Sequence, residues 1–245
     1  MNAPSDVLGR AGAVLRAVAA QEPTGTTTSA AARAAGLPRP TTHRLLASLQ
    51  SEGLVDRDPG SGRWLLGPEL YFLGVAAAPR YDVTALAQPV VRRLARATGE
   101  SAFFSARRGD ETICLVREDG SFPIRSHVLS EGVRFPLGVA SAGMVLLAHL
   151  PDREVDAYLQ RADLDAAAAR EHVERTRETG YAVNPGLVVE GSWGLGAAVF
   201  DAEGRPRWAL SLTGVAHRFA DDRRPDLGAL LLREAHELTR TLAKR

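Results

Sequence analysis

The sequence predicts an α+β protein of two domains, a small helical domain followed by a larger one that mixes helices with strands. The first 50 residues carry apolar side chains at helical spacing, interrupted by glycine and proline, whereas residues 181–213 alternate as strands do. The length of 245 residues suits two modest domains, and a hydrophobic content of 45% suffices for buried cores.

Three helices are expected in the first 50 residues. The first spans Asp6 to Ala20, where apolar residues recur every three or four positions. A second, rich in alanine, runs from Ser29 to Ala35 and ends at Gly36, because glycine tolerates the left-handed conformation that closes many helices. Pro38 and Pro40 then open a third helix, since proline is tolerated in a first turn.

The third helix has one apolar face and one face of small and basic residues. At about 100° per residue, Leu45, Leu46 and Leu49 define the inner face, and Thr42 falls beside them. The opposite face and its flanks carry Pro40, Thr41, His43, Arg44, Ala47 and Ser48. Short side chains permit close approach to a surface, and arginine reaches a base edge or a phosphate. The pattern favours a DNA-reading helix, with an ordinary bundle helix as the alternative.

Charge is distributed unevenly around this helix. No acidic residue occurs between Glu22 and Glu52, whereas Arg33, Arg39 and Arg44 lie in that window of a chain whose net charge is +1. A local basic surface on a near-neutral protein is typical of docking onto a polyanion. The general preference for arginine over lysine has a second explanation, a GC-rich genome.

A β-hairpin is expected directly after the third helix. Leu54-Val55 and Trp64 to Leu66 flank a turn at Asp58 to Gly62. Helix, glycine turn, helix and hairpin together make a winged helix-turn-helix. Arg57 and Arg63, on the arms of the hairpin, are candidates to contact phosphates, and simple solvation is the alternative.

A linker helix is predicted from Glu69 to Ala77, after Gly67-Pro68. Its apolar residues, among them Phe72, indicate a surface for another copy of the chain. Pro79-Arg80 breaks the chain again. The expected organisation is therefore a winged helix-turn-helix domain over 1–67, a linker helix over 68–80 and a second domain over 81–245.

The second domain alternates helices and strands. Helices are expected at 83–97, 141–149, 151–160, 164–179 and 222–243, and strands at 101–107, 111–117, 181–184, 194–200 and 207–213.

Two neighbouring strands of this domain predict a cavity. Ser192, Gly194 and Gly196 share one face of the first strand, and bulky apolar residues occupy the other. In the next strand Ser211 and Thr213 share a face. If the bulky faces lie on the same side, the glycines leave a space that the hydroxyl groups line. Close packing of a helix onto the glycines is the alternative.

The segment Ser141 to Gly143 opens a predicted helix, which Ser141 is expected to cap. The first N–H groups of a helix have no partner within it, and they attract carboxylates and other anions. The segment is therefore a second candidate for ligand binding, next to an ordinary capped helix as the alternative.

Several classes of function find no support. The six histidines show no metal-ligand spacing, no GxSxG sequence occurs, and Gly194-Leu195-Gly196 lacks the full phosphate-binding fingerprint. We expect no catalytic residue, no metal and no cofactor. No apolar run is long enough to span a membrane, and the N-terminus does not resemble a secretion signal. The single cysteine, Cys114, fits the reducing cytoplasm, where we expect the protein.

Four segments, in order, resemble the IclR family, the isocitrate lyase regulators. They are GLPRPTTHRLLASLQSEGLV, RWLLGPELYFLG, FPLGVASAGMVLLAHLP and GYAVNPGLVVEGSWGLGAAVFDAEGRPRWALSLTG. The resemblance spans nearly the whole chain. It implies a winged helix-turn-helix joined to a GAF-like effector-binding domain, acting on operator DNA as a homodimer or dimer of dimers. It further implies that a small organic or aromatic acid tunes the DNA affinity.

The resemblance also implies roles for individual residues. DNA contacts fall on Arg39, Thr41, His43 and Arg44, and effector contacts fall on Ser141, Ala142, Gly143, Asn184, Ser192, Gly194, Ser211 and Thr213. The chain departs from the family's common residues at Met144, Asn184 and Ala198, so the resemblance does not name the effector. The alternatives are a ligand-sensing or interaction module without DNA binding and, with less support, an enzyme acting on small acids.

Overall fold

The computed structural model describes residues 6–78, 83–124 and 129–244, and the chain divides into two compact units, 1–81 and 82–245. Each unit has a hydrophobic core of its own. The predicted break at Pro79-Arg80 lies outside the described residues. Among the helices that are described, none is long and apolar enough to cross a membrane.

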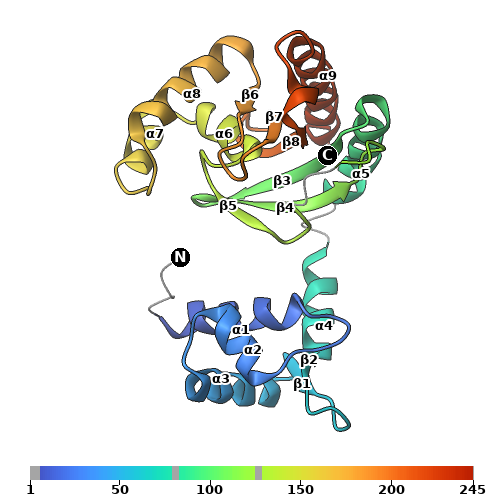
Figure 1. Ribbon diagram of the computed structural model, residues 1–245, viewed down its shortest axis with the longest axis vertical. Coiled ribbons are helices and arrows are strands. Elements are labelled where there is room, and N and C mark those ends of the chain that lie inside the picture. The colour runs from blue at the N-terminus through green and yellow to red at the C-terminus, as the bar shows by residue number, and fades with distance from the viewer. Residues whose placement is uncertain (1–5, 79–82, 125–128, 245) are drawn as a thin grey trace. The chain divides into compact units, whose positions relative to one another are not determined.

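The first unit has the predicted helices, hairpin and linker helix (Figure 1). In chain order these are α1 (Val7–Ala19), α2 (Thr28–Ala35), α3 (Arg39–Ser51), β1 (Val55–Arg57), β2 (Trp64–Leu66) and α4 (Pro68–Ala77). The Asp6 carboxylate caps α1 by accepting a hydrogen bond from the Gly9 amide at 2.7 Å. Gly36 ends α2 in the left-handed region, at a φ of 65°.

The core of the first unit confirms the inner face expected for α3. Leu46 and Leu49 are buried against Val14 and Val18 of α1 and against Trp64 of the hairpin. Thr42 is also buried, and its hydroxyl donates to the Pro38 carbonyl at 3.2 Å. Because these residues face inward, the opposite side of α3 lies on the surface.

The hairpin is fastened to the start of α2. Trp64 exchanges backbone hydrogen bonds with Thr26, at 2.8 and 2.9 Å, so a third short strand segment lies beside β2. The Trp64 indole Nε1 donates to the Thr28 hydroxyl at 3.0 Å. These bonds fix the position of the hairpin relative to the start of α2.

The second unit combines helices with one β-sheet. Its elements are α5 (Val83–Thr98), β3 (Ser101–Arg108), β4 (Glu111–Glu118), β5 (Arg134–Pro136), α6 (Ser141–Ala148), α7 (Asp152–Leu159), α8 (Ala166–Thr179), β6 (Ala182–Asn184), β7 (Ser192–Phe200), β8 (Pro206–Val215), the 3-10 helix η2 (Ala216–Phe219) and α9 (Arg224–Leu242). Within the described residues, six strands form one antiparallel sheet in the order β5-β4-β3-β8-β7-β6.

Helices cover both faces of this sheet (Figure 1). On one face, α5 and α9 pack on a core that includes Phe104, Leu195 and Leu210. On the other, α6, α7 and α8 enclose a second core around Leu146 and Tyr158, in which small residues of the sheet such as Ala198 take part. The bulky residues of β7 and β8 therefore lie on the same side of the sheet, as the cavity hypothesis requires.

One strand was absent from the sequence-based expectation. β5 spans only three residues and pairs with β4, with Phe135 opposite Thr112. Three residues are too few to show an alternating pattern, so the pairing depends on tertiary contacts.

Candidate DNA interface and ligand pocket

The outward face of α3 carries most of the residues that the sequence proposed for DNA. Arg39, His43, Arg44 and Ser48 are exposed, and Thr41 is half-buried. Within the part of the chain that the structure describes, neither Arg39 nor Arg44 makes a hydrogen bond or an ion pair. Their guanidinium groups are therefore available to a phosphate or to a base edge in a groove.

The two hairpin arginines are engaged with the protein itself. The Arg57 Nε donates to the Gly62 carbonyl at 3.2 Å, and its guanidinium lies 5.6 Å from the centre of the Trp64 ring. The Arg63 Nη1 donates to the Gly25 carbonyl at 3.0 Å. Both side chains thus stabilise the hairpin, a role that the sequence did not reveal, while their remaining N–H groups stay free for other acceptors.

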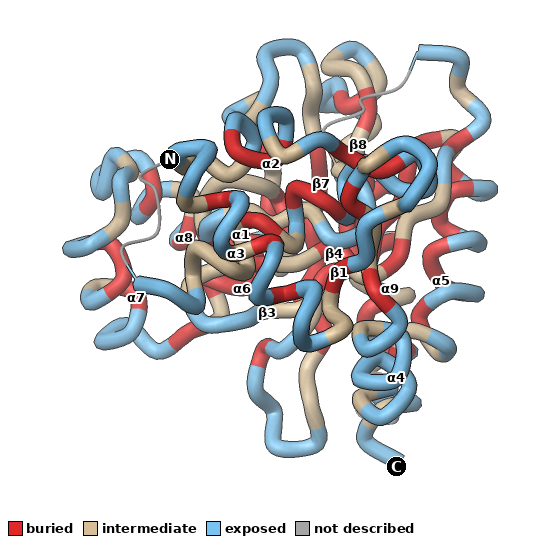
Figure 2. The backbone as a smooth tube through the Cα atoms, turned by 90° about the horizontal axis from the view of Figure 1, so that it is seen from below, coloured by how far each residue is buried: buried red, intermediate tan, exposed pale blue. Residues whose placement is uncertain are grey.

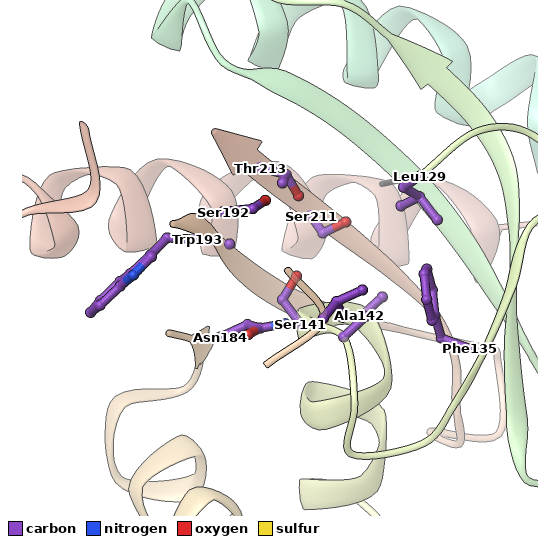
Figure 3. A pocket seen from close by; sticks show the side chains of 12 residues that line it. Leu129, Phe135, Ser141, Ala142, Asn184, Ser192, Trp193, Ser211 and Thr213 are labelled. Atoms are coloured by element: carbon purple, nitrogen blue, oxygen red, sulfur yellow. The ribbon is translucent and has the colours of Figure 1, made fainter. Parts of the chain in front are cut away.

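The second unit has a pocket where β7 and β8 face the start of α6 (Figure 3). Its lining consists of Leu129, Phe135, Ala140, Ser141, Ala142, Asn184, Val188, Ser192, Trp193, Gly194, Ser211 and Thr213. All the effector-contact residues named from the sequence belong to it except Gly143, and Gly196, which was expected to open the same space, does not line it. The side chain of Trp193 points away from the other labelled residues, so this residue lines the pocket through its backbone.

The glycines of β7 resolve the two alternatives that the sequence left open. A Cβ on Gly194 would lie 3.0 Å from the Leu212 carbonyl oxygen, 3.1 Å from the Ser141 Oγ and 3.4 Å from the Thr213 Oγ1, on the pocket side of the strand. A Cβ on Gly196 would overlap the Ser141 carbonyl. Gly194 therefore keeps the pocket open, whereas Gly196 lets α6 lie against the sheet.

Gly143 serves close packing rather than lining the pocket. A Cβ there would come within 3.1 Å of the Leu137 Cα and the Pro136 carbonyl oxygen. The reason is the direction of α6, whose buried first turn rests against the segment that leads into the helix.

The start of α6 is the polar end of the pocket. The N-cap is Ala140, which offers no side-chain hydrogen bond, so the expectation that Ser141 caps the helix is wrong. Ser141 is instead the first helical residue and is 5% exposed. An uncapped N-terminus presents unpaired N–H groups and a partial positive charge, and both favour an anion.

Asn184 joins the two loops that border the pocket. Its Nδ2 donates to the Val139 carbonyl at 3.0 Å, and its Oδ1 accepts from the amides of Gly186 and Leu187 at 3.0 and 2.8 Å. The side chain is 6% exposed. Asn184 thus shapes the pocket wall, and most of its hydrogen-bonding capacity is already used.

The apolar part of the lining comes from segments that gave no sequence signal. Leu129, Phe135 and Val188 lie outside the strands and helices that the sequence predicted, in stretches without periodic pattern. The free volume between the lining residues is about 30 Å³, room for about two water molecules. A larger guest therefore requires these half-buried side chains to shift. The lining holds no charged side chain, and it suits a small anion with an apolar body.

The described residues contain no group of three or more His, Cys, Asp or Glu side chains arranged to hold a metal. Burial raises the pKa of the Cys114 thiol to about 12, because the thiolate would lose its hydration inside the sheet. The thiol therefore stays protonated and unreactive near neutral pH.

Comparisons with known proteins agree on one family over both units. The profile described as "Bacterial transcriptional regulator IclR C-terminal" matches residues 75–240, and the profile of the IclR helix-turn-helix domain matches residues 7–59. The chain belongs to the IclR family. It is a DNA-binding transcriptional regulator, which disfavours an interaction module without DNA binding. The family is one of transcriptional regulators.

Individual IclR relatives resemble the chain along most of its length. It is 28% identical over 218 residues to the transcriptional repressor IclR of Escherichia coli K12, covering 85% of this chain and 80% of that protein. It is 29% identical over 215 residues to the repressor AllR of the same organism, covering 84% and 79%.

Solved structures of IclR-type proteins show the same fold. An IclR transcriptional regulator from Alicyclobacillus acidocaldarius superposes with a TM-score of 0.77 at 25% identity, covering 96% of this chain and 98% of the other. An IclR homolog from Microbacterium hydrocarbonoxydans, complexed with 4-hydroxybenzoate, superposes with a TM-score of 0.78 at 22% identity, covering 98% of this chain and 100% of the other.

Proposed function

We propose that this IclR-type regulator reads operator DNA with the exposed face of α3 and that a small organic acid in the pocket beside α6 changes its DNA affinity. The observation that carries the proposal is the pocket itself. An uncapped helix start, several hydroxyl groups and the space above Gly194 converge there without any charged side chain. The protein acts by binding alone, and its DNA target places it in the cytoplasm.

The proposed DNA interface centres on Arg44. This residue lies on the exposed side of α3 and has no partner among the described residues, so it is available to read a base edge in the major groove. Arg39, Thr41, His43 and Ser48 surround it as further contacts to bases or phosphates. Arg57 and Arg63 add phosphate contacts from the hairpin through the N–H groups that the protein does not use.

In the proposed complex with effector, the carboxylate of an organic acid lies at the N–H groups of Ala142 and Gly143. The hydroxyls of Ser141, Ser211 and Thr213 are available as further donors or acceptors, Ser192 lines the same wall, and Leu129, Phe135 and Val188 cover the apolar body. The relative complexed with 4-hydroxybenzoate supports an aromatic acid as the first class of compound to test.

We further propose that α4 joins two copies of the chain, as a homodimer or within a dimer of dimers. The helix buries none of its residues within its own chain, and Figure 2 shows it exposed along its length. Tyr71 and Phe72 are 70% and 61% exposed, and Leu73 and Val75 are more than half exposed. An apolar helix that lies open to water favours burial against an identical helix, and a two-fold dimer matches the symmetry of a palindromic operator.

The test of DNA reading is a gel-shift titration of the full chain against its own upstream region, repeated at rising salt. A phosphate-driven interface requires affinity to fall steeply with salt. The Arg44→Ala variant should lose about 1 to 3 kcal/mol of binding free energy and relax specificity. Arg207→Ala, an exposed arginine on β8, is the matched control and should leave binding unchanged. Salt-independent binding, or equal affinities of the two variants, would contradict the proposal.

The test of ligand control is a thermal-shift titration with 4-hydroxybenzoate and other organic acids, with and without upstream DNA. Because coupling between two ligands is reciprocal, an acid that weakens DNA binding must itself bind more weakly when DNA is present. An acid that stabilises the protein equally in both conditions does not control DNA affinity. If no organic acid stabilises the protein, the proposed effector site is wrong.

A further inference from the structure

The second unit has another hollow on the opposite side of β6. It is lined by residues of α8, of the strand that follows it and of the start of α9: His172, Arg175, Thr176, Thr179, Tyr181, Val183, Asp221, Arg224 and Pro225. Its free volume is about 200 Å³, against about 30 Å³ for the pocket beside α6. Neighbouring residues of β6 separate the two spaces, since Asn184 lines the first and Val183 the second.

Polar groups that suit an oxyanion converge in this hollow. Arg175 of α8 and Arg224 at the start of α9 both line it, so it is bordered by two arginines from different helices. Thr176 is 2% exposed, yet its hydroxyl makes no hydrogen bond to any described residue, although it lines the hollow. The described residues hold no fully buried side-chain nitrogen or oxygen without a partner, so this hydroxyl borders open space, where water or a ligand can bond to it. Tyr181 and Val183 supply apolar surface beside these groups.

The acidic residues near the hollow are weak competitors for the two arginines. Asp221 pairs with Arg224, but its side chain is 91% exposed. Glu171 pairs with Arg175, and its side chain is 68% exposed. Exposed ion pairs contribute little because water and salt screen them. A ligand oxyanion inside the hollow, where Arg224 is only 24% exposed, would be screened less.

We infer that this hollow is a second ligand site, separate from the pocket beside α6, and that it binds a small molecule through one oxyanion group. The two guanidinium groups bind the oxyanion, the Thr176 hydroxyl adds a hydrogen bond, and Tyr181 with Val183 contacts the remainder of the molecule. The inference does not depend on DNA binding, because it concerns groups of the second unit alone.

The fluorescence of Trp193 can report ligand binding at this site. The guanidinium of Arg224 lies 5.2 Å from the centre of the Trp193 ring, over its face. An anion that draws Arg224 into the hollow changes this contact and hence the indole fluorescence. Replacing Trp193 with phenylalanine should remove the fluorescence change without removing the heat of binding.

The experiment titrates the full chain with benzoate and, separately, with methyl phosphate, followed by calorimetry and tryptophan fluorescence. Both titrations use the Gly194→Ala background, in which the added methyl group fills the first pocket. Saturable binding of either probe is expected, and the tighter probe tells whether the natural oxyanion is a carboxylate or a phosphate. Arg224→Gln and Arg175→Gln should each weaken binding about tenfold or more, the usual effect of losing a charge-assisted hydrogen bond.

Arg207→Gln is the matched control, since Arg207 is exposed and lies outside both sites. It should bind the probes as the parent does. Unchanged melting temperatures without probe will show that the variants fold. The inference is overturned if neither probe gives a saturable titration, if Arg224→Gln binds as tightly as the parent, or if Arg207→Gln weakens binding as much as Arg224→Gln does.

Discussion

The Nδ2 of Asn184 donates a hydrogen bond to the carbonyl oxygen of Val139 at 3.0 Å and so ties the loop after β6 to the loop before α6. The residues are 45 positions apart in the chain. The same side chain accepts hydrogen bonds from the amides of Gly186 and Leu187, which shapes the turn beyond it. One amide therefore sets the relative position of two walls of the proposed effector pocket.

Replacing Asn184 with alanine should loosen both walls. The Val139 carbonyl and two backbone amides would lose their partner, at a cost of about 1 to 3 kcal/mol in the free energy of unfolding. Hydrogen exchange should speed up at the amides of Gly186 and Leu187. Asn184→Asp is an informative comparison, because it keeps an acceptor for these amides and replaces the donor to Val139 with a charged oxygen that repels the carbonyl. Unchanged exchange in the alanine variant would show that the loops hold their shape without Asn184.

Gly194 and Gly196, near the start of β7, should respond differently to replacement by alanine. Gly194→Ala should cost less free energy of unfolding than Gly196→Ala, because its methyl group enters the pocket at 3.0 Å from the Leu212 carbonyl oxygen rather than overlapping the backbone, but it should abolish effector binding. Gly196→Ala should destabilise the second unit, because its methyl group would overlap the Ser141 carbonyl and force α6 off the sheet. Urea unfolding and ligand titration of both variants check the contrast. Equal loss of stability would contradict the assigned roles.

Glu100 is the buried anchor of the segment that leads into α9. Its Oε1 accepts hydrogen bonds from the Arg218 Nε at 2.5 Å and from the Arg223 Nη1 at 2.8 Å, and its side chain is 2% exposed. Removing one member of a buried ion pair leaves uncompensated charge, so Glu100→Ala should cost about 3 to 5 kcal/mol in the free energy of unfolding. The exposed Glu203, which pairs with Arg205, is the control, and Glu203→Ala should cost less than about 1 kcal/mol.

Cys114 should resist thiol reagents while the protein is folded. Burial raises the pKa of its thiol from the ordinary 9.0 to about 12, so the reactive thiolate is scarce at pH 8. Because the folded state holds this proton more tightly than the unfolded state, the contribution of Cys114 to stability is complete below pH 9. It is lost as the pH rises from there toward 12. Alkylation with and without urea checks the first expectation, and Cys114→Ala isolates the second. Rapid modification of the folded protein would contradict both.

The sequence was sufficient to predict an element and its exposed face wherever a repeating pattern extended over several helical turns or several pairs of strand residues. The helical periods of the first 50 residues gave α1, α2 and α3, and the same periods placed Arg44 on the exposed side. The alternation in β7 and β8 gave the direction of Gly194, Ser211 and Thr213 toward one pocket. Whether the proposed DNA and effector contacts form remains a prediction for these residues.

Other features could not be predicted from the sequence, because each depends on a single residue or a short segment rather than on a repeating pattern. β5 was missed, and with it the place of Phe135 in the pocket. Leu129 and Val188 line the same pocket from loops that carry no pattern. The Cα of Gly143 packs against Leu137, a contact that no sequence pattern indicates, and Ser141 begins the helix that it was expected to cap.

For this protein, the sequence by itself determined the kinds of element, their order and the faces they bury, because the apolar period of a helix or strand is a property of neighbouring residues. Only the tertiary structure decided which glycine opens a cavity and which admits a helix. It also decided that Arg57 and Arg63 hydrogen-bond within the first unit and that two arginines from different helices line a second hollow. These relationships join residues far apart in the chain, and their side-chain directions are set by packing rather than by local spacing.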